Sequence, residues 1–454
     1  MSLRPIPTAV RPYQFPRVER ATLANGLNVQ VVPMHRLPIV TVLALVNVGA
    51  SADARGQEGL AALTARTLDE GTAALDGAAL TERFEALGAS FEASADWDST
   101  VARVTVTPRH LDEAVSLFAE VLRTPLFPAA DVEREREERI DALAQALAEP
   151  RGLADMRFTG LLYAGARYGR PAGGNAQSVA TLSAEQLRAF HAAHYGPRTT
   201  TLIVVGDITL DAAMRLAEAK FGDWQSDATH VPVSNMDTAD TRRRSVIITK
   251  PDAPQTELRI GHAGVPRVHE DHLAVVVMNA ILGGLFSSRI NLNLREKHAF
   301  TYGASSGYDW RRGAGPFVVS TAVKTEVTDR AVQEVLREID GMRAAAPTSA
   351  ELSLATDYLA GVFPIRFEST AAVAGAVAGA VVYGLTDAWF RSYRDQVQAI
   401  TPEAVHRAAL AHLDPSRLLL LAVGDSAAIE APLRALAHGP LQVMSATQDP
   451  SESK

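Results

Sequence analysis

The segment Thr181-Leu182-Ser183-Ala184-Glu185 leads through His194 and Pro197 to an apolar run that ends in Gly206-Asp207. Its key positions recur later in the chain at one constant spacing of 218 residues, so that Ser183, Glu185, His194, Pro197, Gly206 and Asp207 match Thr401, Glu403, His412, Pro415, Gly424 and Asp425. A second echo pairs Gly88-Ala89-Ser90 with Gly303-Ala304-Ser305 at a spacing of 215. Two echoes at nearly equal spacing predict two homologous halves.

The duplication also sets the domain boundaries. We predict a first half over residues 18–224 and a second half over residues 242–440. Between them, residues 225–241 are polar, contain a proline and lack an apolar period, which is typical of a linker. The segment 441–454 is predicted to be a disordered tail.

Strand and helix signals alternate within each half. Residues 21–32 turn at Asn25-Gly26, and residues 39–48 are almost wholly apolar, as in a buried strand. Residues 111–122 and 131–147 space their apolar positions by three and four, as helices do. These patterns predict an α+β fold.

Composition excludes several classes of function. A formal charge of −8 argues against a nucleic-acid partner, and the absence of cysteine excludes disulfides and thiolate zinc sites. Neither a phosphate-binding G-x-x-x-x-G-K-[ST] loop nor a G-x-S-x-G elbow occurs. No run of about 18 apolar residues predicts a membrane span. The compartment stays open: cytoplasmic as written, or periplasmic if a signal peptide has been removed.

The stretch Gly59-Leu60-Ala61-Ala62-Leu63-Thr64-Ala65-Arg66-Thr67-Leu68-Asp69-Glu70-Gly71-Thr72 resembles the active-site helix of the insulinase-like (pitrilysin-type, inverted zincin) metallopeptidases. In catalytic members this frame holds H-x-x-E-H, with two zinc-binding histidines and a glutamate base. Here Ala62 and Arg66 stand at the histidine positions and Ala65 at the base. The family's third ligand, a later glutamate, corresponds to Ala142. The resemblance therefore implies a degenerate site that binds no metal.

Glu135, seven residues before Ala142, matches an auxiliary acidic position of the active members. Two interpretations are open. Glu135 is either a solvated side chain in a charge-rich helix, or the partner of Arg66, whose positive charge then replaces that of the metal.

In the second half, Leu294-Arg295-Glu296-Lys297-His298-Ala299-Phe300-Thr301-Tyr302-Gly303 is similar to the family's R-E-x-x-G-L-x-Y segment. It departs from that segment at His298-Ala299, where relatives usually carry glycine. The resemblance implies that Arg295 and Tyr302 bind substrate beside the scissile bond, since both side chains donate hydrogen bonds suited to a peptide carbonyl. Without the resemblance, Arg295 would be taken as a surface helix residue and Tyr302 as a packed strand residue.

The resemblance also implies the architecture and the leading function. Each half is expected to contain two similar α/β layers with mostly antiparallel sheets, and the halves are expected to close as a clamshell. In some bacterial relatives one chain carries zinc and another carries the arginine–tyrosine pair. We therefore expect a zinc-less subunit without a cofactor of its own, which pairs with a catalytic H-x-x-E-H homologue or with itself and binds peptide. The alternatives are a structural or assembly protein with a vestigial peptidase fold, and an enzyme of another chemistry.

Two histidine clusters are candidate metal sites. His269-Glu270-Asp271-His272 has suitable donors, but it precedes the apolar residues 273–282 and is typical of a polar helix start. His191 and His194 have similar spacing, but His194 recurs as His412, which indicates a structural role in both repeats. We therefore predict no metal ligands in this chain.

Overall fold

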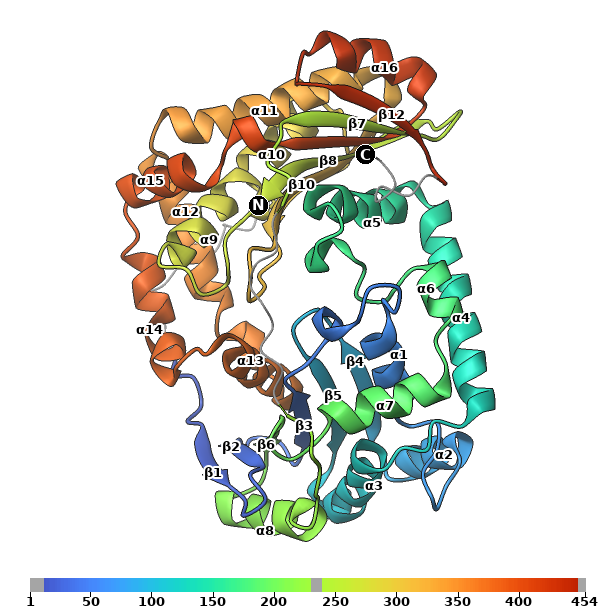
Figure 1. Cartoon of the computed structure of the whole chain (residues 1–454). Coiled ribbons are helices and arrows are strands. Elements are labelled where there is room, and N and C mark those ends of the chain that lie inside the picture. The colour runs from blue at the N-terminus through green and yellow to red at the C-terminus, as the bar shows by residue number, and fades with distance from the viewer. Residues whose placement is uncertain (1–11, 230–238, 448–454) are drawn as a thin grey trace, which may run out of the picture.

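The computed structural model describes residues 12–229 and 239–447. Each half contains one six-stranded sheet covered by helices, and the two halves are stacked one above the other in Figure 1. Most neighbouring strands are antiparallel, and the predicted α+β class with two homologous halves facing each other is confirmed.

The first sheet has the strand order β1-β2-β6-β3-β5-β4, and only β2 and β6 run parallel. Its strands are β1 Glu19–Thr22, β2 Asn28–Pro33, β3 Val40–Val46, β4 Ser90–Ala95, β5 Thr100–Val106 and β6 Thr200–Gly206. The central strands β3 and β6 are buried along their whole length, as their apolar sequences predict. Strand β4 forms one edge of this sheet.

The second sheet has the order β12-β7-β11-β8-β10-β9, so its last five strands repeat the arrangement of the first sheet. Its strands are β7 Arg244–Thr249, β8 Gln255–Ala263, β9 Ala304–Tyr308, β10 Pro316–Lys324, β11 Leu419–Gly424 and β12 Leu441–Ser445. The outermost strand differs between the halves. In the first half β1 precedes β2 in the chain, whereas in the second half β12 comes from the C-terminal end.

The repeated sequence segment forms the same helix and strand in both halves. Ser183 and Thr401 cap the N-termini of α7 (Ala184–His194) and α15 (Pro402–His412) with their side-chain oxygens. Gly206 ends β6 with φ +143°, and a Cβ there would lie 2.1 Å from the Ile39 carbonyl oxygen. A side chain cannot be accommodated at this strand end, which explains the glycine.

The remaining helices surround the two sheets (Figure 1). In the first half they are α1 Leu60–Arg66, α2 Gly77–Ala86, α3 Leu111–Arg123, α4 Ala129–Ala148, α5 Pro150–Tyr163, α6 Ala176–Ala180 and α8 Leu210–Phe221, with short 3-10 turns η1 Ala50–Ala52, η2 Pro108–His110 and η3 Arg167–Gly169. In the second half they are α9 His272–Asn279, α10 Arg289–Asn291, α11 Thr328–Ala344, α12 Ser349–Val362, α13 Thr370–Tyr383, α14 Asp387–Gln398 and α16 Ser426–Ala435, with π-helical turns η4 Ala280–Gly284 and η5 Leu292–Lys297 and 3-10 turns η6 Thr325–Val327, η7 Ile365–Phe367 and η8 Pro415–Arg417.

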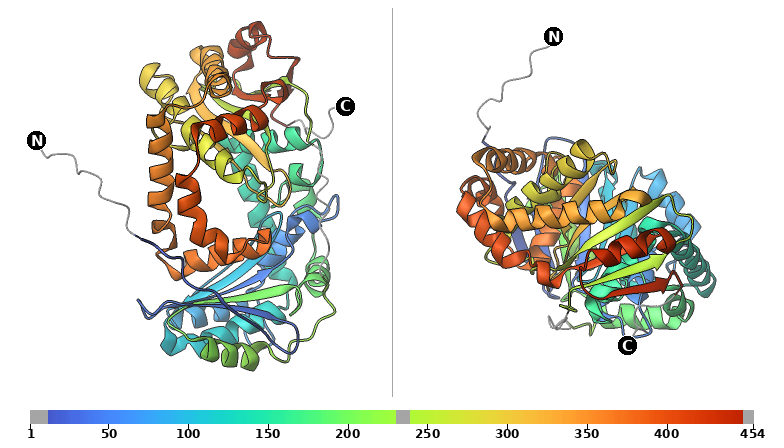
Figure 2. Two further views of the ribbon diagram at one scale, coloured as in Figure 1. Left: turned by 90° about the vertical axis from the view of Figure 1, so that its left-hand side faces the viewer. Right: turned by 90° about the horizontal axis from the view of Figure 1, so that it is seen from above.

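The two halves exchange one helix each. Helix α13 of the second half packs on β3 and β6 of the first sheet, and α5 of the first half packs on β8 and β11 of the second. The left view of Figure 2 shows the orange helices of residues 349–398 reaching from one half to the other. Because each sheet buries one face against a helix of the other half, the apolar core is continuous between the halves.

The predicted boundaries need one correction. Residues 441–445, assigned from the sequence to a disordered tail, form strand β12 and pair with β7 in parallel. Only Met444 of this edge strand is buried, and its five residues are too few to show a clear period. Residues 225–229 and 239–241 of the predicted linker contain no helix or strand, whereas residues 230–238 of the linker and 448–454 of the tail lie outside the described residues.

One described helical stretch, residues 272–297, is long and apolar enough to cross a membrane by length and composition alone. Its residues Val275, Val277, Met278 and Leu282 are buried in the core of the second half. Packing against the second sheet and its helices therefore explains the apolar character of this stretch.

A buried histidine joins the strand ends at the outer edge of the second sheet. The His438 Nδ1 atom accepts hydrogen bonds from the Arg243 guanidinium at 3.0 and 3.2 Å, and its Nε2–H donates to the Leu418 carbonyl at 3.3 Å. This arrangement requires the neutral imidazole. Burial, together with Arg243, lowers the pKa of His438 to about 4.

We expect His438 to make the protein less stable in mild acid. Its folded pKa lies below the unfolded value of about 6.5, so its contribution is fully present above pH 6.5 and is lost as the pH falls toward 4. The expected loss is about 3 kcal/mol between pH 7 and pH 4. Urea unfolding at several pH values should show a weaker pH dependence for His438→Gln. Equal slopes for the wild-type chain and His438→Gln would contradict this assignment.

Candidate functional site

The helix that carries the degenerate zinc positions is fixed at its start by a buried carboxylate. The Asp53 side chain accepts the backbone N–H groups of Gly59 and Ala61 at 2.9 and 3.0 Å. Burial raises the pKa of Asp53 to about 7, although these two hydrogen bonds act in the opposite direction. Gly59 has φ +98°, a left-handed conformation that favours glycine and turns the chain into α1. The glycine of the sequence frame therefore has a structural reason.

The four degenerate positions carry no metal donor. Ala62 is half-buried and Ala65 is fully buried on α1, while Arg66 is the exposed last residue of that helix. Ala142 is exposed on α4, which packs beside α1. A methyl group cannot coordinate a cation or accept a proton, and a guanidinium repels a cation. These residues do not fit a zinc ion.

Arg66 is held by acidic residues of α4. Its Nε atom donates to Glu135, and its Nη2 atom donates to Glu138 at 3.0 Å. The predicted pairing of Arg66 with Glu135 is confirmed, and the interpretation of Glu135 as a solvated side chain is wrong because only 6% of it is exposed. The motif frame does not indicate the second acid, Glu138, although it lies one helical turn from Glu135 on the same face.

A second arginine completes this charge network. Arg134 donates to Glu135 at 2.6 Å, to Glu138 at 3.2 Å and to Glu70 at 2.6 Å. Two guanidinium groups thus pair with three carboxylates beside the degenerate zinc positions. Burial raises the pKa of the adjacent Asp69 to about 6, and Glu70 and Glu135 contribute to the rise. Each of the three carboxylates therefore has a guanidinium partner, and removal of a partner would leave a partly buried charge uncompensated.

Arg295 and Tyr302 lie on the surface of the second half. Arg295 belongs to η5, and its guanidinium lies 4.6 Å from the centre of the Phe286 ring, a distance typical of a cation–π contact. The nearest carboxylate, Glu296, lies 3.5 Å away. Tyr302 precedes edge strand β9 and is 93% exposed, so the alternative of a packed strand residue is wrong. Among the described residues, none hydrogen-bonds to its hydroxyl group.

Arg295 and Tyr302 make no bond with the charge network at the degenerate zinc positions, as far as the structure describes the chain. Across residues 12–229 and 239–447, no hydrogen bond or ion pair joins Arg295 or Tyr302 to Arg66, Glu135 or Glu138. Both side chains therefore keep donors that the chain itself does not use.

Between Arg295 and Tyr302, the backbone adopts a left-handed conformation that favours glycine, although the residue there is alanine. Ala299, at the departure from the family pattern, has φ +53°, in the left-handed region that L-residues occupy at a cost of about 1–2 kcal/mol. Ala299→Gly is therefore expected to raise the free energy of unfolding by about 0.5–1 kcal/mol, after the larger unfolded-state entropy of glycine is subtracted. Chemical denaturation would measure it. Ala345→Gly, at an extended φ of −151°, is the matched control and should lower stability; equal effects would contradict the strain at Ala299.

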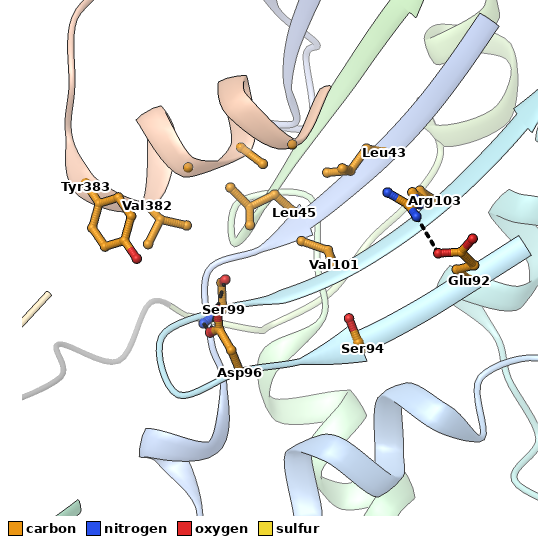
Figure 3. Close-up of a pocket in the computed structure, with 13 residues that line it drawn as sticks. Leu43, Leu45, Glu92, Ser94, Asp96, Ser99, Val101, Arg103, Val382 and Tyr383 are labelled. Atoms are coloured by element: carbon orange, nitrogen blue, oxygen red, sulfur yellow. Dashed lines mark hydrogen bonds and ion pairs between the residues drawn. The ribbon is translucent and has the colours of Figure 1, made fainter. Parts of the chain in front are cut away.

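A groove runs beside edge strand β4 of the first sheet. It has a volume of about 310 Å³ and lies between α13 and the face of β3, β4 and β5 (Figure 3). Leu43, Leu45 and Val101 provide an apolar floor, whereas Ser94 and Asp96 provide polar groups near the edge. Because β4 has a strand neighbour on one side alone, its other side offers backbone hydrogen bonds to an added strand.

Two family profiles match the chain in tandem. The profile described as insulinase (peptidase family M16) matches residues 32–173, and the profile described as peptidase M16 inactive domain matches residues 181–359. The chain belongs to the insulinase family. Its first half thus carries the zinc-site frame in substituted form, and residues 242–359 of its second half lie within the match to the inactive-domain profile.

Individual insulinase-family relatives agree with this assignment. A Helicobacter pylori protein named zinc protease PqqE is 24% identical over 388 residues, which cover 82% of this chain and 86% of that protein. A Mycobacterium tuberculosis protein named as an uncharacterized zinc protease is 26% identical over 354 residues, covering 77% and 80%. A crystal structure described as the peptidase M16 inactive domain from Pseudomonas fluorescens superposes with a TM-score of 0.85 at 28% identity, covering 90% of this chain and 98% of that one. A protease from Helicobacter pylori shares the fold, with a TM-score of 0.84 at 19% identity and coverage of 90% and 100%.

Three histidines outside the insulinase frame are packed against the protein core. His191 is buried and bonds the Leu122 carbonyl at 2.9 Å, and His194 packs on Phe190. His272 is buried, and burial lowers its pKa to about 3, with Arg267 and His269 acting in the same direction.

His269, Asp271 and His412 have potential ligand atoms within 4.8 Å of one another. This donor set could hold a divalent cation. However, Asp271 already accepts a 2.8 Å hydrogen bond from His412, and its backbone N–H donates to His269 at 3.1 Å. These bonds join the C-terminus of α15 to the start of α9, in keeping with the predicted polar helix start. His194 and His412 end equivalent helices but make different contacts, so the predicted common role does not extend to their bonds.

Proposed function

We propose that this chain is the zinc-less subunit of a two-chain insulinase-family peptidase. It closes the chamber and holds an extended peptide through Arg295 and Tyr302, while an H-x-x-E-H homologue provides zinc and the base. The supporting observation is the contrast between the two halves of the chain. Arg66 is neutralised by acids at the former zinc position, whereas the Tyr302 hydroxyl is exposed and unused.

The expected binding mode is addition of the peptide as a strand to a sheet edge, in the manner of peptide recognition by edge strands. Strand β4 borders a groove, and strand β9 follows directly after Tyr302-Gly303, so both edges are candidates. Guanidinium and phenol groups donate to the peptide carbonyl and to the oxyanion that develops during hydrolysis. The chemistry of water activation belongs to the partner's zinc, and this chain requires no cofactor.

Mixing the purified chain with candidate H-x-x-E-H homologues tests the proposal. We expect neither chain alone to cleave a fluorogenic peptide efficiently, and the mixture to show activity that saturates at equal amounts of the two chains. Metal analysis of the isolated chain should find less than stoichiometric zinc. If no homologue gains activity on mixing, and the chain instead forms assemblies without peptide turnover, the structural or assembly role is favoured.

A further inference from the structure

A second cavity, lined mainly by aromatic side chains, lies within the second half. Its volume is about 420 Å³, in the range of small-ligand sites. Helices α9, α12 and α14 and the chain after β9 form its walls. The aromatic lining consists of Tyr308, Trp310, Tyr358, Phe363, Phe367, Trp389 and Tyr393. Such a lining favours a flat or bulky apolar group.

The charges in this lining are all positive. Arg267 and Arg366 line the cavity, and no aspartate or glutamate does. Arg267 is half-buried, with its guanidinium 4.7 Å from the centre of the Trp389 ring. Among the described residues, neither arginine forms an ion pair with a carboxylate. His272 adds no charge, because burial lowers its pKa to about 3.

A half-buried guanidinium that stacks on tryptophan and lacks an acid keeps most of its donors available. A carboxylate satisfies these donors in a two-pronged geometry, and its attached apolar group contacts the aromatic walls. The buried Nδ1 atom of His272 is a further polar atom of this wall without a hydrogen-bond partner among the described residues. A buried polar atom without a partner calls for an explanation.

We propose that this cavity binds a carboxylate attached to an aromatic or bulky apolar group, and that its source is the free C-terminal residue of a peptide. The choice of a peptide rests on the function proposed above. Leu285 lines the cavity, and the next residue, Phe286, carries the Arg295 guanidinium on its ring. The cavity and the predicted substrate-binding pair therefore share one continuous segment of chain.

Fluorescence titration of the full-length chain alone tests this site, because two of its four tryptophans, Trp310 and Trp389, line the cavity. The probes are an N-acetylated peptide ending in phenylalanine with a free carboxylate, the same peptide as a C-terminal amide, and 3-phenylpropionate. We expect the free acid to bind at least about tenfold more tightly than the amide, because the hydrogen bonds to a charged group are lost in the amide. Equal affinity of acid and amide, or no binding of either acid, would overturn the proposal. Binding of 3-phenylpropionate without the peptide acid would overturn the peptide source and retain the carboxylate chemistry.

Variants of the two lining arginines test whether the acid binds in this cavity. Arg267→Gln is expected to weaken binding of the free acid by about tenfold and to leave the amide unchanged. Since Arg267 packs on Trp389, the exposed Arg366→Gln provides a second variant that keeps this packing, with an expected loss of a few-fold. Arg407→Gln, exposed on α15 outside the cavity, is the matched charge control. Unchanged affinity in both cavity variants would refute the site.

The two-chain peptidase and the carboxylate site can be refuted independently of each other. A chain that binds the free acid but gains no activity with any homologue would refute the two-chain peptidase alone. A chain that forms an active mixture but binds acid and amide equally would refute the carboxylate site alone.

Discussion

Arg295→Ala is expected to lower kcat/KM of the reconstituted two-chain peptidase by about 100-fold or more. Removing one preorganised donor to a developing oxyanion typically costs this much. Arg295 is only 35% exposed and rests on the Phe286 ring, so its guanidinium is already restricted before substrate binds. Tyr302→Phe should cost less, about tenfold, because a single neutral hydrogen bond is lost from a fully exposed side chain.

The division between kcat and KM distinguishes two roles for the pair. A donor that acts mainly on the oxyanion lowers kcat with little change in KM, whereas a donor that grips the substrate backbone raises KM. Lys297→Ala is the matched control, since Lys297 is an exposed cation in the same turn, η5, and should change kcat/KM by less than about twofold. If Lys297→Ala and Arg295→Ala reduce activity equally, the segment contributes general positive charge rather than a positioned donor.

The fold was largely predictable because its signals are local and repeated. Strands β3 and β6 are mostly apolar and buried along their whole length, and the repeated Ser183 and Thr401 cap equivalent helices. The exchange of α5 and α13 between the halves was not predictable. Helix α13 is rich in alanine, glycine and valine on all sides, so its sequence indicates burial but not which sheet it covers. Strand β12 was missed because an edge strand exposes most of its side chains.

The candidate site, like the fold, was predictable only in part. The motif frame identified Ala62, Ala65, Arg66 and Ala142, and the family's auxiliary acidic position together with opposite charge made the contact of Arg66 with Glu135 one of two interpretations. The aromatic cavity had no comparable signal, because its lining extends from residue 267 to residue 393 and no motif spans that distance. The pairs Phe363 with Phe367 and Trp389 with Tyr393, each four residues apart, were the local indication that two helix faces share an aromatic surface.

Arg311→Ala is expected to destabilise the folded chain by about 3 kcal/mol, because Arg311 joins the two halves. It belongs to the second half, yet its guanidinium lies 3.6 Å from the ring centre of Trp97 and 4.7 Å from that of Tyr168, both in the first half. Its Nη1 atom donates to the Tyr168 carbonyl at 3.3 Å, and Asp309 balances its charge at 2.6 Å. A desolvated cation–π contact contributes about 2 kcal/mol, and the hydrogen bond adds about 1 kcal/mol.

Neighbouring bonds make this contact part of a larger connection. The buried Asp98 carboxylate accepts the Tyr168 hydroxyl at 3.0 Å and the Arg312 backbone N–H at 2.8 Å, and the Tyr168 hydroxyl oxygen accepts the Gly313 N–H at 3.0 Å. The loop is therefore also fastened to the first half just after Arg311. Loss of the Arg311 side chain therefore leaves the rings of Trp97 and Tyr168 without their stacked guanidinium. Because the rest of the loop stays attached, the resulting cavity cannot collapse.

Urea unfolding of Arg311→Ala, Arg311→Lys and Arg434→Ala would measure this connection. Lysine keeps the charge but not the planar stack, so Arg311→Lys should recover less than half of the loss. Arg434, which forms an exposed pair with Glu430 on α16, should cost no more than about 0.5 kcal/mol when it is replaced by alanine. Wild-type stability in Arg311→Lys would show that charge alone matters at this position, and the stacked guanidinium would then have no special part in joining the halves.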